Sequence, residues 1–394
     1  MHSTRQLFFE LMAQTSAAPI GLEIEKASGC WLYSSDGRKY LDLVAGVSVS
    51  NIGHNNPMVI KAVKEQLDKH MHLMVYGEFI QKPQVQLAEK LCSLLPVNLN
   101  SVYYTCSGSE AVEGSIKLAR RHTGRHEVIS FRNAYHGSTI GALSVTGNES
   151  LKRAFRPLMP SVRQIEFGRE EQLEEISRST ACVLVEPVQA EAGVIIPGDD
   201  FLGKLSDKCK REGALLIFDE IQTGFGRTGE LFAMDRYSVY PDILLLAKSL
   251  GGGMPLGAFI SSREIMGSLS SNPALGHITT FGGHPVSCAA GLASIDYITG
   301  NDLVKKAARA GAKFRELLVH DEIRNVRGQG LLMAVELDNP AKTRKAVSAC
   351  IAGGAITEWF LFNENCLRIS PPLTISDSEI ETACRILLDS VKRA

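Results

Sequence analysis

Short apolar runs of strand length recur through the middle of this chain, and segments with helical spacing separate them. The runs are residues 101–105, 128–131, 181–185, 214–218 and 243–246. Most of them lack the apolar–polar alternation of a strand that has one face in water, so we expect strands buried on both faces. Such strands, alternating with helices, form a mostly parallel sheet covered by helices. The pattern predicts a large α/β domain over residues 50–300.

The C-terminal quarter has a different pattern. Residues 326–337 look like one strand after a glycine turn, and residues 366–369 look like another. A last helix should begin after Ser376, because Ser376 and Glu379 have the spacing of a capping box ahead of an apolar stripe. We expect a smaller α+β domain formed by residues 301–394 together with residues 1–49.

Composition narrows the possible partners. The 394 residues carry a formal net charge of -1, which gives no reason to expect nucleic acid or an acidic membrane surface as a partner. The nine cysteines are scattered and form no C-x-x-C pair, so neither a zinc site nor a disulfide framework is expected. The first residues lack the pattern of an export signal, and no apolar run reaches the roughly 18 residues of a membrane span. We expect a soluble, cytoplasmic protein.

Lys248 is the first candidate for chemistry. It ends an apolar strand and is followed, two residues later, by three glycines. Burial lowers the pKa of an amine, and a neutral amine is the form that attacks an aldehyde. Glycines there would let the backbone pass close to a bound ring. The alternative is a lysine that extends from the strand end into solvent.

Asp219 ends the preceding strand. A buried carboxylate is costly unless a cation accompanies it, and the carboxyl ends of parallel strands are where ligands bind in α/β sheets. A protonated pyridine nitrogen would be such a cation and would keep the ring an electron sink. The alternative is a structural carboxylate paired with Arg227 or another base.

Two further segments follow strands. Ser107, Gly108 and Ser109 lead a strand into a helix, where exposed N–H groups offer a phosphate site, although a plain serine N-cap would have the same sequence. Tyr135 and His136 follow another strand, and an aromatic ring there would either stack on a cofactor or simply pack.

Residues 224–229 match the G-x-G-x-x-G pattern of dinucleotide sites. That pattern must lie directly between a strand and a helix, with an acid ending the next strand. Here the strand ends five residues earlier, at Asp219, and the next strand leads to Lys248. The spacing therefore argues against a nicotinamide cofactor.

With these residues assembled, the chain resembles the class III (ω-amino-acid) aminotransferases of the fold type I pyridoxal-phosphate superfamily. The likeness runs from Gly46 to Pro372 through seven motifs in order. They are Ser107-Gly-Ser-Glu110, Tyr135-His-Gly137, Glu186-Pro-Val-Gln-Ala-Glu191-Ala-Gly193, Asp219-Glu-Ile-Gln222, Lys248-Ser-Leu-Gly-Gly-Gly253, Thr280-Phe-Gly-Gly283 and Arg368-Ile-Ser-Pro-Pro372. Any one of them could arise by chance, but the whole series in this order could not.

The resemblance implies pyridoxal 5'-phosphate as cofactor and a role for each matching residue. Lys248 would hold the cofactor as a Schiff base and transfer the proton, and Asp219 would pair with the pyridine nitrogen. The cofactor-binding set would also include Ser107, Gly108, Ser109, Tyr135, His136, Glu186 and Gln222. Tyr135 would stack on the ring, and Gln222 would contact its hydroxyl. Thr280 would reach the phosphate from a second subunit, which makes a homodimer part of the active site.

The resemblance also implies a substrate site. Glu191 and Arg368 match the family's switch pair, in which the arginine binds the α-carboxylate of glutamate or 2-oxoglutarate and the glutamate masks it when an ω-amine donor enters. A plain structural ion pair is the alternative. Val47, Ser138 and Thr279 complete the expected substrate-binding set.

The subgroup resembled most is the acetylornithine/ornithine aminotransferase branch. Val47 stands near the position of a tyrosine in ornithine aminotransferases, and an apolar residue suits a donor whose α-amine is capped or absent. Ser138 departs from the family, which has a carboxylate-binding arginine after the Tyr-His-Gly motif. Donors of the 4-aminobutyrate, diamine or β-amino-acid type therefore stay open. A decarboxylase, racemase or aminomutase on the same fold is a second class of reaction, and a non-catalytic binding protein is a third.

Overall fold

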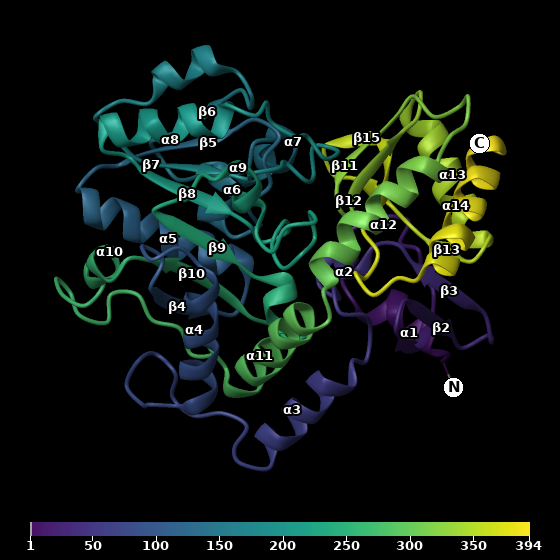
Figure 1. The fold of residues 1–394 in the computed structure, drawn as a ribbon, viewed down its shortest axis with the longest axis horizontal. Coiled ribbons are helices and arrows are strands. Elements are labelled where there is room, and N and C mark those ends of the chain that lie inside the picture. The colour runs from purple at the N-terminus through teal and green to yellow at the C-terminus, as the bar shows by residue number, and fades with distance from the viewer. Residues whose placement is uncertain (1) are drawn as a thin grey trace.

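A seven-stranded sheet forms the larger half of the molecule (Figure 1). The computed structural model describes residues 2–394, so Met1, the first residue of the predicted small domain, lies outside the described part. In order across the sheet the strands are β4 (Ser101–Thr105), β10 (Gly257–Ser261), β9 (Ile243–Leu246), β8 (Leu215–Asp219), β7 (Thr180–Val185), β5 (Glu127–Phe131) and β6 (Val162–Ile165). Neighbours from β9 to β6 are parallel, whereas β10 is antiparallel to both β4 and β9. The predicted α/β fold with a mostly parallel sheet is confirmed.

The middle strands are buried on both faces, as their unbroken apolar sequences predict. Every residue of β7, β9 and β10 is buried. Along β9, Ile243 and Leu245 pack in one hydrophobic cluster, whereas Leu244 and Leu246 pack in the other. Successive side chains of a strand point to opposite faces, so each face of the sheet has its own core.

Helices cover both faces. Helix α5 (Gly108–Thr123) belongs to one cluster and α8 (Phe201–Glu212) to the other. Each ends at a glycine in the left-handed conformation, Gly124 and Gly213, which is a common helix stop. The remaining helices of this half are α3 (Pro57–Leu67), α4 (Lys82–Leu94), α6 (Ile140–Val145), α7 (Glu149–Lys152), α9 (Ala233–Tyr237), α10 (Arg263–Gly267) and α11 (Pro285–Gly300), with 3-10 turns η1 (Arg153–Phe155), η2 (Glu170–Glu175) and η3 (Lys248–Gly251).

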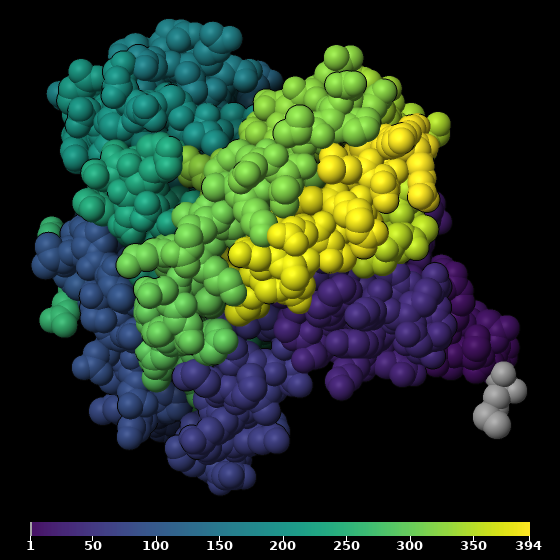
Figure 2. All heavy atoms as spheres, turned by 45° about the vertical axis from the view of Figure 1, so that its right-hand side comes forward, coloured from purple at the N-terminus to yellow at the C-terminus, as the bar shows by residue number. Residues whose placement is uncertain are grey.

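Two small sheets form the other half. One contains β1 (Ile24–Ser28), β2 (Trp31–Ser34), β3 (Lys39–Asp42) and β13 (Ala355–Ile356), and the other contains β11 (Asn325–Gln329), β12 (Leu332–Glu336), β15 (Asn363–Ile369) and β14 (Trp359–Phe360). Helices α1 (Thr4–Leu11), α2 (Ala45–Ser48), α12 (Leu303–Leu317), α13 (Pro340–Ala352) and α14 (Asp377–Lys392) accompany them. The parallel pairing of β13 with β3 joins the N-terminal segment to the C-terminal segment of the chain. Figure 2 shows N-terminal residues packed along C-terminal ones. This pairing supports our proposal that residues 1–49 and 301–394 form one small domain.

The prediction of a single strand over residues 326–337 was wrong. The segment forms the hairpin β11–β12, because Gly330 turns the chain in the left-handed conformation (φ 52°). The last helix begins as predicted, since Ser376 and Glu379 form a capping box at the start of α14. Within residues 2–394, no helix is both long and apolar enough to cross a bilayer.

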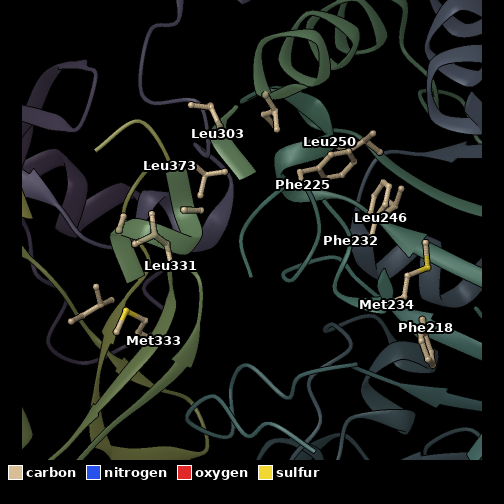
Figure 3. Close-up of a cluster of buried hydrophobic side chains, with 14 of the residues drawn as sticks. Phe218, Phe225, Phe232, Met234, Leu246, Leu250, Leu303, Leu331, Met333 and Leu373 are labelled. Carbon is tan, nitrogen blue, oxygen red and sulfur yellow. The ribbon is translucent and has the colours of Figure 1, made fainter. Parts of the chain in front are cut away.

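The glycine pattern at residues 224–229 has a packing role between the two halves. Gly226 and Gly229 have positive φ angles of 87° and 88°, which favour glycine. A Cβ at Gly226 would lie 2.9 Å from Leu373, and one at Gly229 would lie 3.1 Å from Ala308. In Figure 3, Leu303, Leu331 and Leu373 come from the half with the small sheets, and Phe225 and Leu250 come from the half with the large sheet. All five belong to one hydrophobic cluster.

Candidate active site

A cavity of about 440 Å³ opens where five strands of the large sheet end. The segments that follow β4, β5, β7, β8 and β9 all contribute to its wall, as expected for the carboxyl edge of a parallel sheet. The lining residues are Val49, Cys106, Ser107, Gly108, Ser109, Tyr135, His136, Gly137, Glu186, Asp219, Ile221, Gln222, Ala247, Lys248, Gly253, Met254, Pro255 and Leu256. Nine of the predicted site residues are among them.

Lys248 lies in the wall of this cavity rather than extending into solvent. Burial lowers the pKa of its amine, and the attraction of Asp219 partly opposes that shift. Its backbone has a left-handed conformation (φ 49°), which costs a non-glycine residue about 1 kcal/mol. An amine that loses its proton easily, in a buried cavity with a carboxylate, is suited to nucleophilic attack on a carbonyl carbon.

Asp219 pairs with His136. The distance from its Oδ2 to His136 Nδ1 is 2.7 Å, and the side chains are 4% and 0% exposed. Its Oδ1 accepts a hydrogen bond from the N–H of Ile221. The pairing with another base is therefore present, but that base is not Arg227, which donates to the carbonyl oxygens of Leu331 and Pro371. Asp219 therefore keeps a fixed orientation at the cavity wall.

Glu186 is a second buried acid beside Asp219. It accepts hydrogen bonds from the N–H groups of Tyr135 and Ala190. Burial raises its pKa well above the usual value, and the charge of Asp219 raises it further. Glu186 is therefore easier to protonate than an exposed glutamate.

The N-terminus of α5 closes the end of the cavity that contains Ser107, Gly108 and Ser109. The Ser107 side chain caps the helix by accepting from the N–H of Glu110. The N–H groups of Gly108 and Ser109 belong to the first turn and so have no partner within the helix. A 16-residue helix whose N-terminus meets a cavity in this way is suited to binding a phosphate group.

Glu191 and Arg368 form a buried ion pair behind this wall. Arg368 Nη2 lies 2.7 Å from both carboxylate oxygens of Glu191, and the side chains are 2% and 4% exposed. Arg368 Nη1 donates to Gln222, which in turn donates to Glu191. The guanidinium also lies over the ring of Phe360, with its carbon 4.3 Å from the ring centre. Gln222 lines the cavity and thus connects it to the pair.

Four other predicted residues do not line the cavity: Val47, Ser138, Thr279 and Thr280. Val49 lines the cavity, and Val47 is a half-buried residue of the same segment. Ser138 is exposed, and its hydroxyl lies 3.2 Å from that of Tyr135. Thr279 accepts a hydrogen bond from the N–H of Gly282, and Thr280 is exposed. Their roles in substrate and cofactor binding stay predictions.

Sequence reasoning missed Glu358, whose Oε1 lies 3.1 Å from Nε of Arg368. It precedes the short strand β14, which has only two residues and no periodicity to indicate it. The predicted strand over residues 366–369, which contains Arg368, was the only available signal, because a hairpin partner of that strand would place a side chain opposite the arginine.

Pyridoxal 5'-phosphate fits this donor set. The helix N-terminus would hold its phosphate, the Asp219 carboxylate its pyridine nitrogen and the Lys248 amine its aldehyde. Nε2 of His136 is buried and has no hydrogen-bond partner among residues 2–394, so the His136 ring is free to contact a ligand. The fold and this site together define a pyridoxal-phosphate-dependent enzyme of fold type I.

Comparison with known proteins gives the family. The family model "Aminotransferase class-III" matches residues 12–391, and the chain belongs to that family of pyridoxal-phosphate-dependent aminotransferases. It is 39% identical to the acetylornithine aminotransferase of Archaeoglobus fulgidus, over 93% of this chain and 94% of that protein. It is 38% identical to the acetylornithine aminotransferase of Methanopyrus kandleri, over 92% of each. The ornithine aminotransferase of Toxoplasma gondii has the same fold, with a TM-score of 0.91 at 31% identity over 100% of this chain and 96% of that one.

Proposed function

We propose that this aminotransferase moves an amino group from an ω-amino acid or amine to 2-oxoglutarate in two half-reactions. The observation that carries the proposal is the buried Glu191–Arg368 pair. If Glu191 swings aside, Arg368 can bind the α-carboxylate of 2-oxoglutarate or glutamate through two parallel N–H bonds. If Glu191 stays, the guanidinium is masked, and a donor without a carboxylate at that position can enter. An enzyme that accepts two dissimilar substrates in turn needs such a pair.

Lys248 is the residue that moves the proton. The cofactor supplies an electron sink for the electron pair that remains when a substrate carbon loses its proton. Lys248 accepts and returns that proton, because burial favours its neutral form. Asp219, oriented by His136, would hold the pyridine nitrogen of the cofactor. Glu186 can remain neutral nearby.

An acetylornithine/ornithine-type donor is favoured. The relatives named acetylornithine aminotransferase and the apolar Val47 both support it. Ser138 stands where a donor carboxylate would meet an arginine in the family, and among residues 2–394 the cavity wall contains no lysine or arginine besides Lys248. The alternative donors are therefore 4-aminobutyrate, diamines and β-amino acids.

We also propose a cytoplasmic homodimer with shared active sites. Thr280 is exposed on one chain and lies beside exposed Ile278 and Phe281, which suits a surface covered by a second copy. Nine cysteines, none in a disulfide within residues 2–394, suit a reducing compartment. Mixing a Lys248→Ala chain with a Thr280→Ala chain and measuring activity of the hybrid tests whether the site is shared.

A donor screen tests the reaction. Acetylornithine, ornithine, putrescine and 4-aminobutyrate are each added to the purified enzyme, first alone and then with 2-oxoglutarate. A transaminase loses the cofactor's absorbance band with donor alone and regains it with the keto acid, whereas a racemase or decarboxylase needs no keto acid. Ser138→Arg should improve donors with a carboxylate and worsen uncharged ones. Equal rates for both kinds of donor in that variant would contradict the role given to Ser138.

A further inference from the structure

Arg368 has a second carboxylate partner besides Glu191. The antiparallel pairing of Trp359 with Leu367 places Glu358 opposite Arg368 on the neighbouring strand segment. The backbone agrees, because the N–H of Arg368 donates to the carbonyl oxygen of Glu358 at 2.8 Å. The side chains meet as well, with 3.1 Å between Glu358 Oε1 and Arg368 Nε. The Nε–H does not make an aligned hydrogen bond, so the contact is an ion pair.

The two carboxylates contact different nitrogens of the guanidinium. Glu191 contacts Nη2, and Gln222 accepts from Nη1, whereas Glu358 lies at Nε. The Glu191 side chain is 4% exposed and the Glu358 side chain is 36% exposed. A ligand carboxylate that replaces Glu191 at Nη2 would therefore leave Glu358 in place.

We propose that Glu358 is a second counter-charge on Arg368 that stays in place when Glu191 leaves, which weakens the affinity of this site for α-carboxylates and so favours their release. The inference rests on the proposed function, in which Arg368 binds the acceptor. While Glu191 is paired with Arg368, Glu358 is repelled by one other carboxylate bound to that arginine, the one of Glu191. When the acceptor is bound, Glu358 is repelled by the ligand carboxylate and also by the displaced Glu191. Binding of the acceptor thus adds a repulsion that the donor state lacks.

The same charge assists loss of the product. A buried guanidinium that lost its only carboxylate would be strongly destabilised. With Glu358 at Nε, Arg368 keeps a partner after the product leaves and before Glu191 returns. The arrangement lowers acceptor affinity and speeds loss of the glutamate product, which suits an enzyme that must empty the site on every cycle.

The test is Glu358→Gln, which removes the charge and keeps the shape. In single-turnover experiments on the amine form of the enzyme, the 2-oxoglutarate concentration at half-maximal rate should fall about three- to tenfold, since a partly exposed charge acts through a screened medium. The maximal rate should stay within about twofold. Calorimetric titration with glutarate, which has no keto group to react, should show a Kd lowered by a similar factor. An unchanged or raised Kd would overturn the proposal.

Three further variants separate charge from geometry and from the proposed function. Glu358→Asp keeps the charge and should behave like the wild type; a shift equal to that of the Gln variant would show that shape, not charge, matters and would overturn the inference. Glu364→Gln removes another carboxylate of the same hairpin, one that pairs with Arg344 of helix α13, and should leave the glutarate Kd unchanged. Arg368→Met should raise that Kd strongly. If it does not, the acceptor site is wrongly assigned and the proposed function fails; if it does while Glu358→Gln has no effect, only the inference about Glu358 fails.

Discussion

Replacing Asp219 with Asn removes a buried charge and keeps the shape of the side chain. Asp219 is 4% exposed and lies 2.7 Å from His136 Nδ1. An oriented charge–charge contact in a water-excluded site is worth about 3 kcal/mol to the transition state, which corresponds to a factor of about 10² in rate. We therefore expect kcat to fall about 100-fold. The pKa of Glu186 should also fall, because the charge of Asp219 helps to raise it.

The assay is steady-state turnover with donor and 2-oxoglutarate, with cofactor content and circular dichroism measured on the same samples. Asp242→Asn is the matched control, because Asp242 accepts a hydrogen bond from the N–H of Leu216 just before β9, at the other end of the strand from Lys248. It should lower the free energy of unfolding by about 1 kcal/mol and leave turnover within about threefold. An Asp219→Asn enzyme that binds cofactor normally and turns over at more than about a third of the wild-type rate would refute the reasoning.

The remaining predictions concern the lysine, the packing and the pH dependence. Lys248→Ala should abolish turnover in the donor assay while circular dichroism shows an intact fold; normal activity would contradict the mechanism. Gly311→Ala places a Cβ 1.9 Å from the carbonyl oxygen of Gly330 and should cost about 1–3 kcal/mol, measured as a lower Tm. Burial raises the pKa of Glu220 from 4.5 to about 7, so the folded state retains a proton that the unfolded chain releases, and stability falls as pH rises through that interval. Glu220→Gln should flatten this fall by up to about 3 kcal/mol in urea titrations at pH 5 and pH 8; an equal slope in both proteins would contradict it.

The large sheet could be predicted because its strands are buried on both faces. Five apolar runs matched β4, β5, β7, β8 and β9 nearly residue for residue. The strand β6 is partly exposed at the sheet edge, and β10 follows a glycine-rich turn with no helix before it, so neither continued the alternation of strand and helix. The hairpin at Gly330 was missed because a glycine inside an apolar run marks a turn as readily as a bulge.

The cofactor side of the site could be predicted for the same reason. In a parallel sheet the residues after each strand meet at one edge, so Lys248 and Asp219 had to lie near each other once their strands were placed. The bond between Asp219 and His136 could not be predicted, because it depends on how the loop after β5 folds back across β8. The position of Val49 at the cavity depends on the turn at residues 45–48, where the backbone has positive φ angles that no sequence pattern indicates.

The substrate side of the site depends on contacts between the two halves of the molecule, and for this reason the sequence did not predict the role of Glu358. Arg368 and Glu358 belong to a hairpin of the small sheet, whereas Glu191 follows β7 and Gln222 follows β8 of the large sheet. The ion pairs therefore depend on how the two halves dock, and that docking is set by contacts such as those of Gly226 and Gly229. A change at this contact should alter acceptor affinity before it alters proton transfer, because Lys248 and Asp219 both belong to the large sheet. Gly229→Ala should therefore raise the glutarate Kd more than it lowers the rate of the donor half-reaction. Equal factors for the two quantities would show that acceptor binding does not depend on the docking of the halves more than proton transfer does.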